Sequence, residues 1–333
     1  MCSIIASCTA SATPTSSGSD RPRPLTVPVL IDCDPGHDDA IALLLALASP
    51  ELELRGVTTV AGNQTLAKTT ANAIRVLEAA GHGHLPVAAG AERPLLREPA
   101  AAAEVHGDSG LDGPALPPPR ARPVEAHAVD FIAEALLAST RAVTLIPLGP
   151  LTNVALLLAR HPEAARRIER VVLMGGAIAE GNVTPAAEFN VWADPEAAAR
   201  VFDSGLDVTM VGLDVTHRAL VLPEHREALR HAGHAGRLVA ELLDFYGVFH
   251  REVYGFAGSP IHDAVAVAHV VTPGMVETEH RHVAVDCQSE LCRGRTVVDV
   301  WRRTGNEPNA QVAVGIDADA FRELLLERLG ALP

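Results

Sequence analysis

From Val27 onward, short apolar runs alternate with longer segments in which apolar residues recur every three or four positions. The short runs predict β-strands and the longer segments predict amphipathic helices. The predicted strands are residues 27–32, 54–62, 85–90, 142–149, 170–176 and 206–214. The predicted helices are residues 41–49, 65–81, 128–139, 151–165, 194–205 and 321–329. This alternation is typical of an α/β fold in which helices cover both faces of an open, mostly parallel sheet with a Rossmann-like core.

The pattern continues without a break from the first strand to the C-terminus, so we predict a single domain over residues 26–333. Residues 1–25 are rich in Ser, Thr and Pro, and their apolar core is short and has no basic residue before it. This composition favours a disordered leader over a secretory signal. No apolar run reaches the roughly 18 residues that a membrane-spanning helix needs.

Composition narrows the classes of partner. The 333 residues include 48% hydrophobic residues and carry a formal charge of −14. A strongly negative chain is a poor partner for nucleic acid or an anionic membrane surface, so a neutral or cationic small substrate is favoured. The odd number of cysteines and the absence of a zinc-ligand spacing predict reduced thiols and a cytoplasmic location, although Cys287 and Cys292 could form a pair.

Four acids lie within eight residues at the end of the first predicted strand: Asp32, Asp34, Asp38 and Asp39. Such carboxylates repel one another and must be desolvated together, which favours a bound cation. Oxygen-only donors suit calcium or magnesium. The alternative is an acidic cap on the next helix, with Asp34 as the cap and Pro35 as the first helical residue. Capping explains one or two of the four acids.

Further polar residues follow the other predicted strands. Asn63 follows the second strand, PLGPLTN follows the fourth, and MGGAIAEGNVTPAAEFN follows the fifth. His262 and Asp263 begin a later apolar helix. Each feature alone is explained by a turn or a cap. Because ligands of open α/β sheets bind outside the carboxyl ends of the strands, together they predict a metal-centred site for a polyhydroxylated ligand.

These residues resemble the nucleoside hydrolases. The family pattern DxDPGxDD is matched by DCDPGHDD, and the resemblance continues in order through VTTVAGNQT, VHGDSG, LGPLTN, VVLMGG, EGNVTPAAEFN, VGLDVTH and IHDAVAVA. It covers the chain from about Pro28 to the C-terminus. The resemblance implies hydrolysis of the N-glycosidic bond of ribonucleosides to ribose and a free base, with a bound calcium ion.

The resemblance also implies roles for individual residues. Asp34, Asp39 and Asp263 would bind calcium through carboxylate oxygens, and Leu148 through its main-chain carbonyl. The family often has Thr at the position of Leu148, a difference of little consequence for a main-chain ligand. Asp34 would also be the general base for the attacking water. His262 would protonate the leaving base, a role that suits an imidazole titrating near neutrality.

The implied substrate-binding residues are Asp38, Asn63, His106, Met174, Asn182, Glu188, Phe189, Asn190, Tyr246 and Tyr254. His262 indicates an inosine-uridine or pyrimidine-preferring enzyme rather than a strictly purine-specific one. Base selection is expected to depend on residues 75–110 and 244–254. Aromatic residues of the second segment either contact the base or pack beneath their helix.

The family commonly forms homodimers or homotetramers, and the same is expected here. Two alternative functions use the same residues differently. A noncatalytic nucleoside or ribose binder would keep the pocket, but it would need neither Asp34 as a base nor His262 as an acid. A magnesium-dependent phosphohydrolase of the haloacid-dehalogenase type would also place DxD after the first strand, but Gly36 stands where that pattern has Thr or Val.

Overall fold

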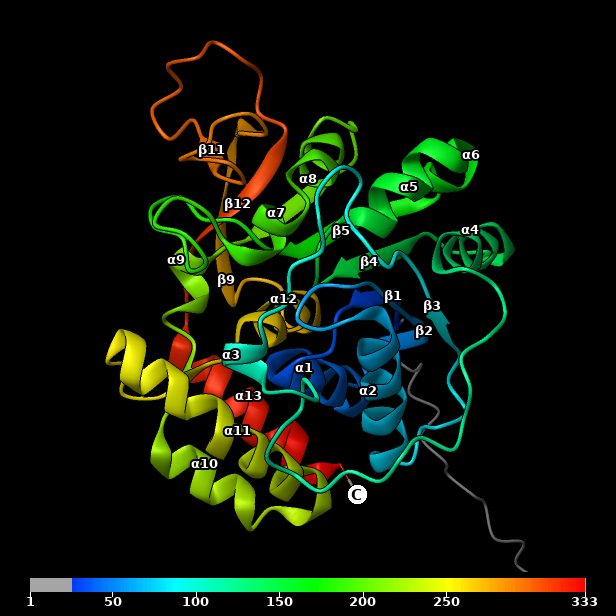
Figure 1. Ribbon diagram of the computed structural model, residues 1–333, viewed down its shortest axis with the longest axis vertical. Helices are drawn as coiled ribbons and strands as arrows, with labels where there is room; N and C mark the ends of the chain where they lie inside the picture. Colours follow the sequence, from blue (N-terminus) through cyan, green and yellow to red (C-terminus); the bar gives the residue numbers. More distant parts are fainter. Residues whose placement is uncertain (1–25, 333) are drawn as a thin grey trace, which may run out of the picture.

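The computed structural model describes residues 26–332, so the predicted leader over residues 1–25 lies outside the described part of the chain. Helices cover both faces of one large sheet, which confirms the predicted α/β fold (Figure 1). The strands are β1 Val27–Cys33, β2 Leu52–Thr59, β3 Val87–Ala89, β4 Val143–Pro147, β5 Ile168–Met174, β6 Val208–Val211, β7 Leu220–Val221, β8 Ser259–Pro260, β9 Val276–Arg281, β10 Val283–Val285, β11 Thr296–Val298 and β12 Ala310–Ile316. The helices are α1 His37–Ala48, α2 Leu66–Ala79, α3 Ala103–His106, α4 Ala128–Ala138, α5 Thr152–Arg160, α6 Pro162–Ala165, α7 Phe189–Ala193, α8 Pro195–Phe202, α9 Leu213–Thr216, α10 Pro223–Arg230, α11 Gly233–Tyr254, α12 His262–Val271 and α13 Ala318–Ala331.

The large sheet has eight strands in the order β3-β2-β1-β4-β5-β6-β12-β9. Strand β1 is parallel to both of its neighbours, β2 and β4, whereas β9 runs antiparallel to β12 at one edge. The strand order reverses between β1 and β4, since β2 and β3 extend the sheet on one side and β5 and β6 extend it on the other. Open α/β sheets bind ligands at such a reversal, outside the carboxyl ends of the strands.

Strand β1 is buried on both faces of the sheet. Its side chains alternate between two apolar clusters: Val29 and Ile31 belong to the cluster that includes residues of α1, α12 and α13, and Leu30 belongs to the cluster that includes residues of α4, α5 and α8. This alternation follows from the two-residue period of a strand. The acids after β1 are therefore anchored to the centre of the molecule.

The fold differs from the pattern predicted by the sequence in several places. The strand predicted over residues 206–214 ends at Val211, and helix α9 begins at Leu213. The helix predicted over residues 151–165 is divided into α5 and α6, because Pro162 begins a new helix and has no N–H group to continue the preceding one. The sequence analysis did not predict the antiparallel edge strand β9 or the two-stranded sheet of β10 and β11. These strands are short and contain many polar residues, so their sequences show no clear alternation of apolar and polar positions.

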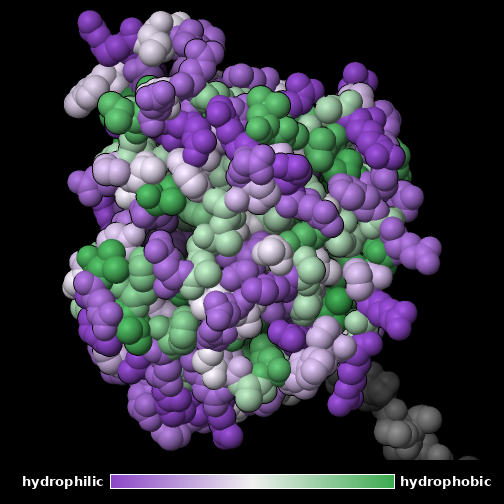
Figure 2. All heavy atoms as spheres, in the orientation of Figure 1, coloured by the Kyte–Doolittle hydropathy of each residue, from purple (hydrophilic) through white to green (hydrophobic). Residues whose placement is uncertain are grey.

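The surface of the molecule is mixed in polarity. In the view of Figure 2, hydrophilic side chains cover most of the face and hydrophobic ones occupy smaller, separate areas. No helix within residues 26–332 has the length and apolar character needed to cross a membrane.

Candidate active site

The acids that follow β1 are held by the turn between β1 and α1. The Asp39 carboxylate accepts hydrogen bonds from the backbone N–H groups of Asp34 and Gly36, at 3.2 and 3.0 Å. Helix α1 begins at His37 with Gly36 as its N-cap. The alternative in which Pro35 begins the helix and Asp34 caps it is therefore wrong, because Asp39 is the acid that satisfies the free N–H groups of this turn.

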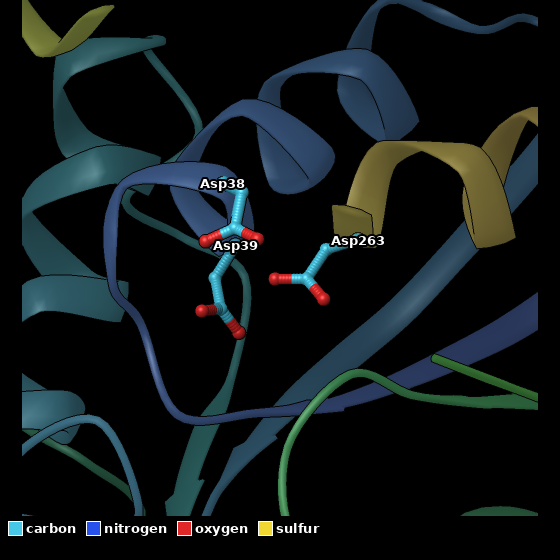
Figure 3. Close-up of side chains that lie close together, drawn as sticks. All are labelled: Asp38, Asp39 and Asp263. Atoms are coloured by element: carbon cyan, nitrogen blue, oxygen red, sulfur yellow. The ribbon is translucent and has the colours of Figure 1, made fainter. Parts of the chain in front are cut away.

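Carboxylates from two helices meet at this end of the sheet. Asp38 and Asp39 lie in the first turn of α1 and Asp263 lies in the first turn of α12, and Figure 3 shows their carboxylates facing a common space. Each offers an oxygen that lies within 4.8 Å of those of the other two. All three side chains are buried. An arrangement of buried oxygen donors is typical of a site for a hard divalent cation.

The electrostatics of this cluster also fit a cation. Burial and the nearby Asp39 charge raise the pKa of Asp38 to about 8, and burial raises the pKa of Asp39 to about 6. Burial and the charge of Asp38 hold the pKa of Asp263 well above its ordinary value. A divalent cation among these groups would favour their ionised forms and offset both the burial and the repulsion.

Asp34 lies beside the cluster with one oxygen free. Its Oδ2 accepts a hydrogen bond from the Asn63 N–H at 2.6 Å. Its Oδ1 is buried and has no hydrogen-bond partner among residues 26–332. Gly62 and Gly149 approach the carboxylate so closely that a Cβ at either position would collide with it. Because an unpaired buried oxygen costs free energy, Oδ1 fits a role in binding a cation or in catalysis.

The loop after β4 completes the oxygen-rich end of the sheet. The Leu148 N–H donates to the carbonyl of Asp32 at 2.7 Å, which fixes this loop to the end of β1. The Leu148 carbonyl accepts a hydrogen bond from Nδ2 of Asn190 at 2.7 Å. The predicted metal ligands thus lie at one end of the sheet and are all oxygen donors, which are the ligands that hard divalent cations such as calcium and magnesium take.

Glu188 is fixed in the wall of the pocket by backbone hydrogen bonds. Its carboxylate accepts from the N–H groups of Gly176, Asn190 and Val191, at 2.9, 2.9 and 3.2 Å. Burial raises its pKa to about 7, although these hydrogen bonds act in the opposite direction. Glu188 therefore has a structural role as the N-cap of α7 in addition to lining the pocket.

Two of the predicted histidines also line the pocket, His262 at the start of α12 and His106 at the end of α3. Nδ1 of His262 lies 2.7 Å from the hydroxyl of Thr216, and Nδ1 of His106 accepts from the His37 N–H at 3.2 Å. Nε2 is thus the ring nitrogen left to contact a ligand. Burial holds the pKa values of both rings well below their ordinary value. Burial therefore disfavours the protonated imidazole that a general acid titrating near neutrality would require at His262.

Helix α11 adds aromatic rings to the same pocket. The ring of Tyr246 stacks on His106 with 5.6 Å between centroids, and the ring of Tyr254 stacks on His250 with 5.9 Å. Tyr246 is fully buried, whereas Tyr254 is partly exposed. These rings therefore pack under the helix and also line the pocket, an arrangement suited to a flat, aromatic ligand.

Most of the predicted site residues line this one pocket: Asp38, Asn63, His106, Leu148, Met174, Asn182, Glu188, Phe189, Asn190, Tyr246, Tyr254, His262 and Asp263. Asp34 and Asp39 lie behind Asn63, which donates hydrogen bonds to both. The sequence analysis did not name Glu104, Val183 or Trp192, which also line the pocket, although Glu104 lies in the segment 75–110 that was expected to affect base selection. Two of these residues could have been suspected because they lie near predicted site residues in the sequence. Glu104 precedes His106 by two positions, and Trp192 follows Phe189 by three.

Comparisons with known proteins agree with this geometry. The model of the inosine-uridine preferring nucleoside hydrolase family matches residues 29–323. Because this match spans most of the chain, the protein belongs to this family of enzymes.

Individual relatives and solved structures agree with the assignment. A pyrimidine-specific ribonucleoside hydrolase, RihA, from Citrobacter koseri is 52% identical over 307 residues, which cover 92% of this chain and 98% of the relative. A plant nucleoside hydrolase structure is 34% identical with a TM-score of 0.86, and the match covers 92% of this chain and 99% of that chain. A purine-preferring ribonucleoside hydrolase structure from Gardnerella vaginalis is also 34% identical with a TM-score of 0.86, covering 92% and 98% of the two chains.

Proposed function

We propose that this enzyme hydrolyses the N-glycosidic bond of ribonucleosides in a calcium-dependent reaction and prefers pyrimidine bases. The main support is the buried cluster of Asp38, Asp39 and Asp263, which lies at a pocket beside the reversal between β1 and β4. The base preference is supported by the curated relatives named pyrimidine-specific, which are 50 to 52% identical to this chain, whereas the purine-preferring structure is 34% identical.

Asp34, Asp39, Asp263 and the Leu148 carbonyl would hold the cation. Calcium bound there would make a water molecule more acidic and would orient the hydroxyl groups of the ribose. Asp34 Oδ1, which has no hydrogen-bond partner within residues 26–332, accepts the proton of the attacking water. Asp38, Asn63 and Asn190 position the ribose hydroxyls from the floor of the pocket.

Cleavage of the bond to the base develops positive charge on the sugar, and the buried carboxylates of the floor stabilise this charge. At the leaving base, the neutral ring of His262 donates a hydrogen bond from Nε2 while its Nδ1 is paired with the Thr216 hydroxyl. This donation disperses the negative charge that the base acquires as the bond breaks, and the departing base then takes up a proton from solvent while Asp34 releases the proton it accepted from water.

His262→Ala should lower kcat for uridine by about a hundredfold but should lower kcat for p-nitrophenyl riboside by only a few-fold. The nitrophenolate leaving group is stable without a proton and so needs little help from the imidazole. Steady-state kinetics on both substrates would measure the difference. Equal losses on the two substrates would contradict a role for His262 at the leaving group and would indicate a general disturbance of the pocket.

The direct test of the proposed function is ribose release from uridine, cytidine, inosine and adenosine, measured with added calcium and with a chelator. Calcium-dependent release that is fastest with the pyrimidine nucleosides would support all parts of the proposal. Binding of nucleosides without release of ribose would instead support the noncatalytic binder. Faster release from inosine and adenosine would refute the base preference alone.

A cytoplasmic location and a homodimeric or homotetrameric assembly remain predictions. Three cysteines in the described part of the chain, Cys33, Cys287 and Cys292, are free thiols. This is compatible with a reducing compartment. Sedimentation of the purified protein would determine the assembly.

A further inference from the structure

The pocket changes in character from its floor to its mouth. Floor residues such as Asn63, Asn190 and Asp263 are buried, whereas Glu104 and Val183 are exposed at the mouth. A ribose held by the buried acids and amides would therefore present its base toward the mouth. This orientation rests on the proposed function, because it requires the sugar to bind on the floor.

The geometry of a pyrimidine then determines which of its atoms reach the mouth. The ring is joined to the ribose through N1, and C4 is the ring atom opposite N1. The substituent on C4 therefore points away from the sugar and toward the exposed end of the pocket. This substituent is an amino group in cytosine and a carbonyl oxygen in uracil, so it presents a hydrogen-bond donor in the first base and an acceptor in the second.

Glu104 lines the exposed end of the pocket, toward which that substituent would point. It lies in α3, which packs against α11 (Figure 1), and it lines the pocket two residues before His106. The charge of Glu104 acts on Tyr254 across the pocket mouth and, after burial, contributes to the raised pKa of that phenol. Among residues 26–332, no residue forms an ion pair with Glu104, and no Lys or Arg lines the pocket.

We propose that Glu104 selects ribonucleosides whose base carries an exocyclic amino group, so that cytidine is preferred to uridine. A carboxylate accepts hydrogen bonds and cannot donate them when it is ionised. It attracts the amino group of cytosine and repels the C4 oxygen of uracil. The discrimination comes both from the favourable contact with one base and from the unfavourable contact with the other.

The test uses the full-length enzyme and the variants Glu104→Gln and Glu104→Lys. The measured quantity is the ratio of kcat/KM for cytidine to kcat/KM for uridine. We expect Glu104→Gln to lower this ratio about fivefold, a moderate effect because the carboxylate is partly solvated. Glu104→Lys should lower it further and favour uridine, since an ammonium group donates hydrogen bonds to the C4 oxygen.

Glu98→Gln is a matched control, because Glu98 is an exposed acid a few residues earlier in the chain and does not line the pocket. Its ratio should equal that of the wild type. Thermal unfolding of each variant would verify that the fold is intact.

Two results would overturn the inference in distinguishable ways. If the wild-type enzyme hydrolyses both nucleosides and the ratio is unchanged in both Glu104 variants, then Glu104 is only a solvated charge and the proposed function stands. If the wild-type enzyme releases ribose from neither nucleoside, the proposed function fails and the selection of bases by Glu104 fails with it.

Discussion

Asp34→Asn should lower kcat for ribonucleoside hydrolysis by about a thousandfold while leaving the fold intact. Asn has nearly the same shape as Asp, and its amide oxygen can still accept the hydrogen bond that the Asn63 N–H gives to Asp34. It cannot take up the proton of the attacking water, and it is a weaker ligand for a cation. Steady-state kinetics with uridine or cytidine at saturating concentration would measure the loss.

Asp130→Asn provides a control for the same change of side chain, because Asp130 lies in α4 and outside the pocket. This variant should retain the activity of the wild type. If the Asp34→Asn variant kept the kcat of the wild type, the assignment of Asp34 as the general base would be refuted. A loss of activity accompanied by unfolding would assign Asp34 a structural role instead, so thermal unfolding should be measured on both variants.

Chelation of divalent cations should reduce activity to the background of the assay, and added calcium should restore it. The expected loss is large because Asp34, Asp39 and Asp263 would repel one another at the floor of the pocket and the ribose would lose its main anchor. The measurement is ribose release after dialysis against chelator, followed by titration with calcium and, separately, with magnesium. Full activity in metal-free protein, verified by elemental analysis, would refute the cation dependence.

The same cation should also affect stability in a pH-dependent way. Without it, the pKa of Asp38 is raised to about 8 and that of Asp39 to about 6. A carboxyl group whose pKa is raised by folding favours the folded state below its ordinary pKa, and this contribution is lost as the pH rises through the raised value. The cation-free protein should therefore lose stability between pH 5 and pH 8.

Calcium binds the ionised carboxylates, so its stabilising effect should increase over the same range. The measurement is the difference in Tm with calcium and with chelator, taken at both pH values. An equal difference at the two pH values would contradict the proposed ionisation of the cluster.

The sequence predicted the central strands and most of the site because both depend on local patterns. Strand β1 is a short apolar run followed by acids, and the polar residues after β2, β4 and β5 converge because the carboxyl ends of parallel strands meet at one edge. Asn63 and Leu148 were found by this reasoning together with the family resemblance.

Other features depend on contacts that no local pattern reveals. The start of α1 is set by the carboxylate of Asp39, which folds back onto the N–H groups of the turn. The low pKa of His262 results from burial among residues that are distant in the sequence. The segment that contains Glu104 has neither strand nor extended helical periodicity, so its place at the pocket mouth depends on tertiary packing.

The close approach of Gly62 and Gly149 to Asp34 has a consequence for the interpretation of sequence variation in this enzyme. Neither glycine contributes a functional group, yet a single added methyl group at either position would occupy the space of the carboxylate. In a library that varies every residue, these two positions should tolerate replacement as poorly as the acids themselves. A design procedure that keeps only residues with reactive side chains unchanged would therefore allow substitutions at Gly62 and Gly149. Such substitutions would displace the Asp34 carboxylate and disrupt the active site.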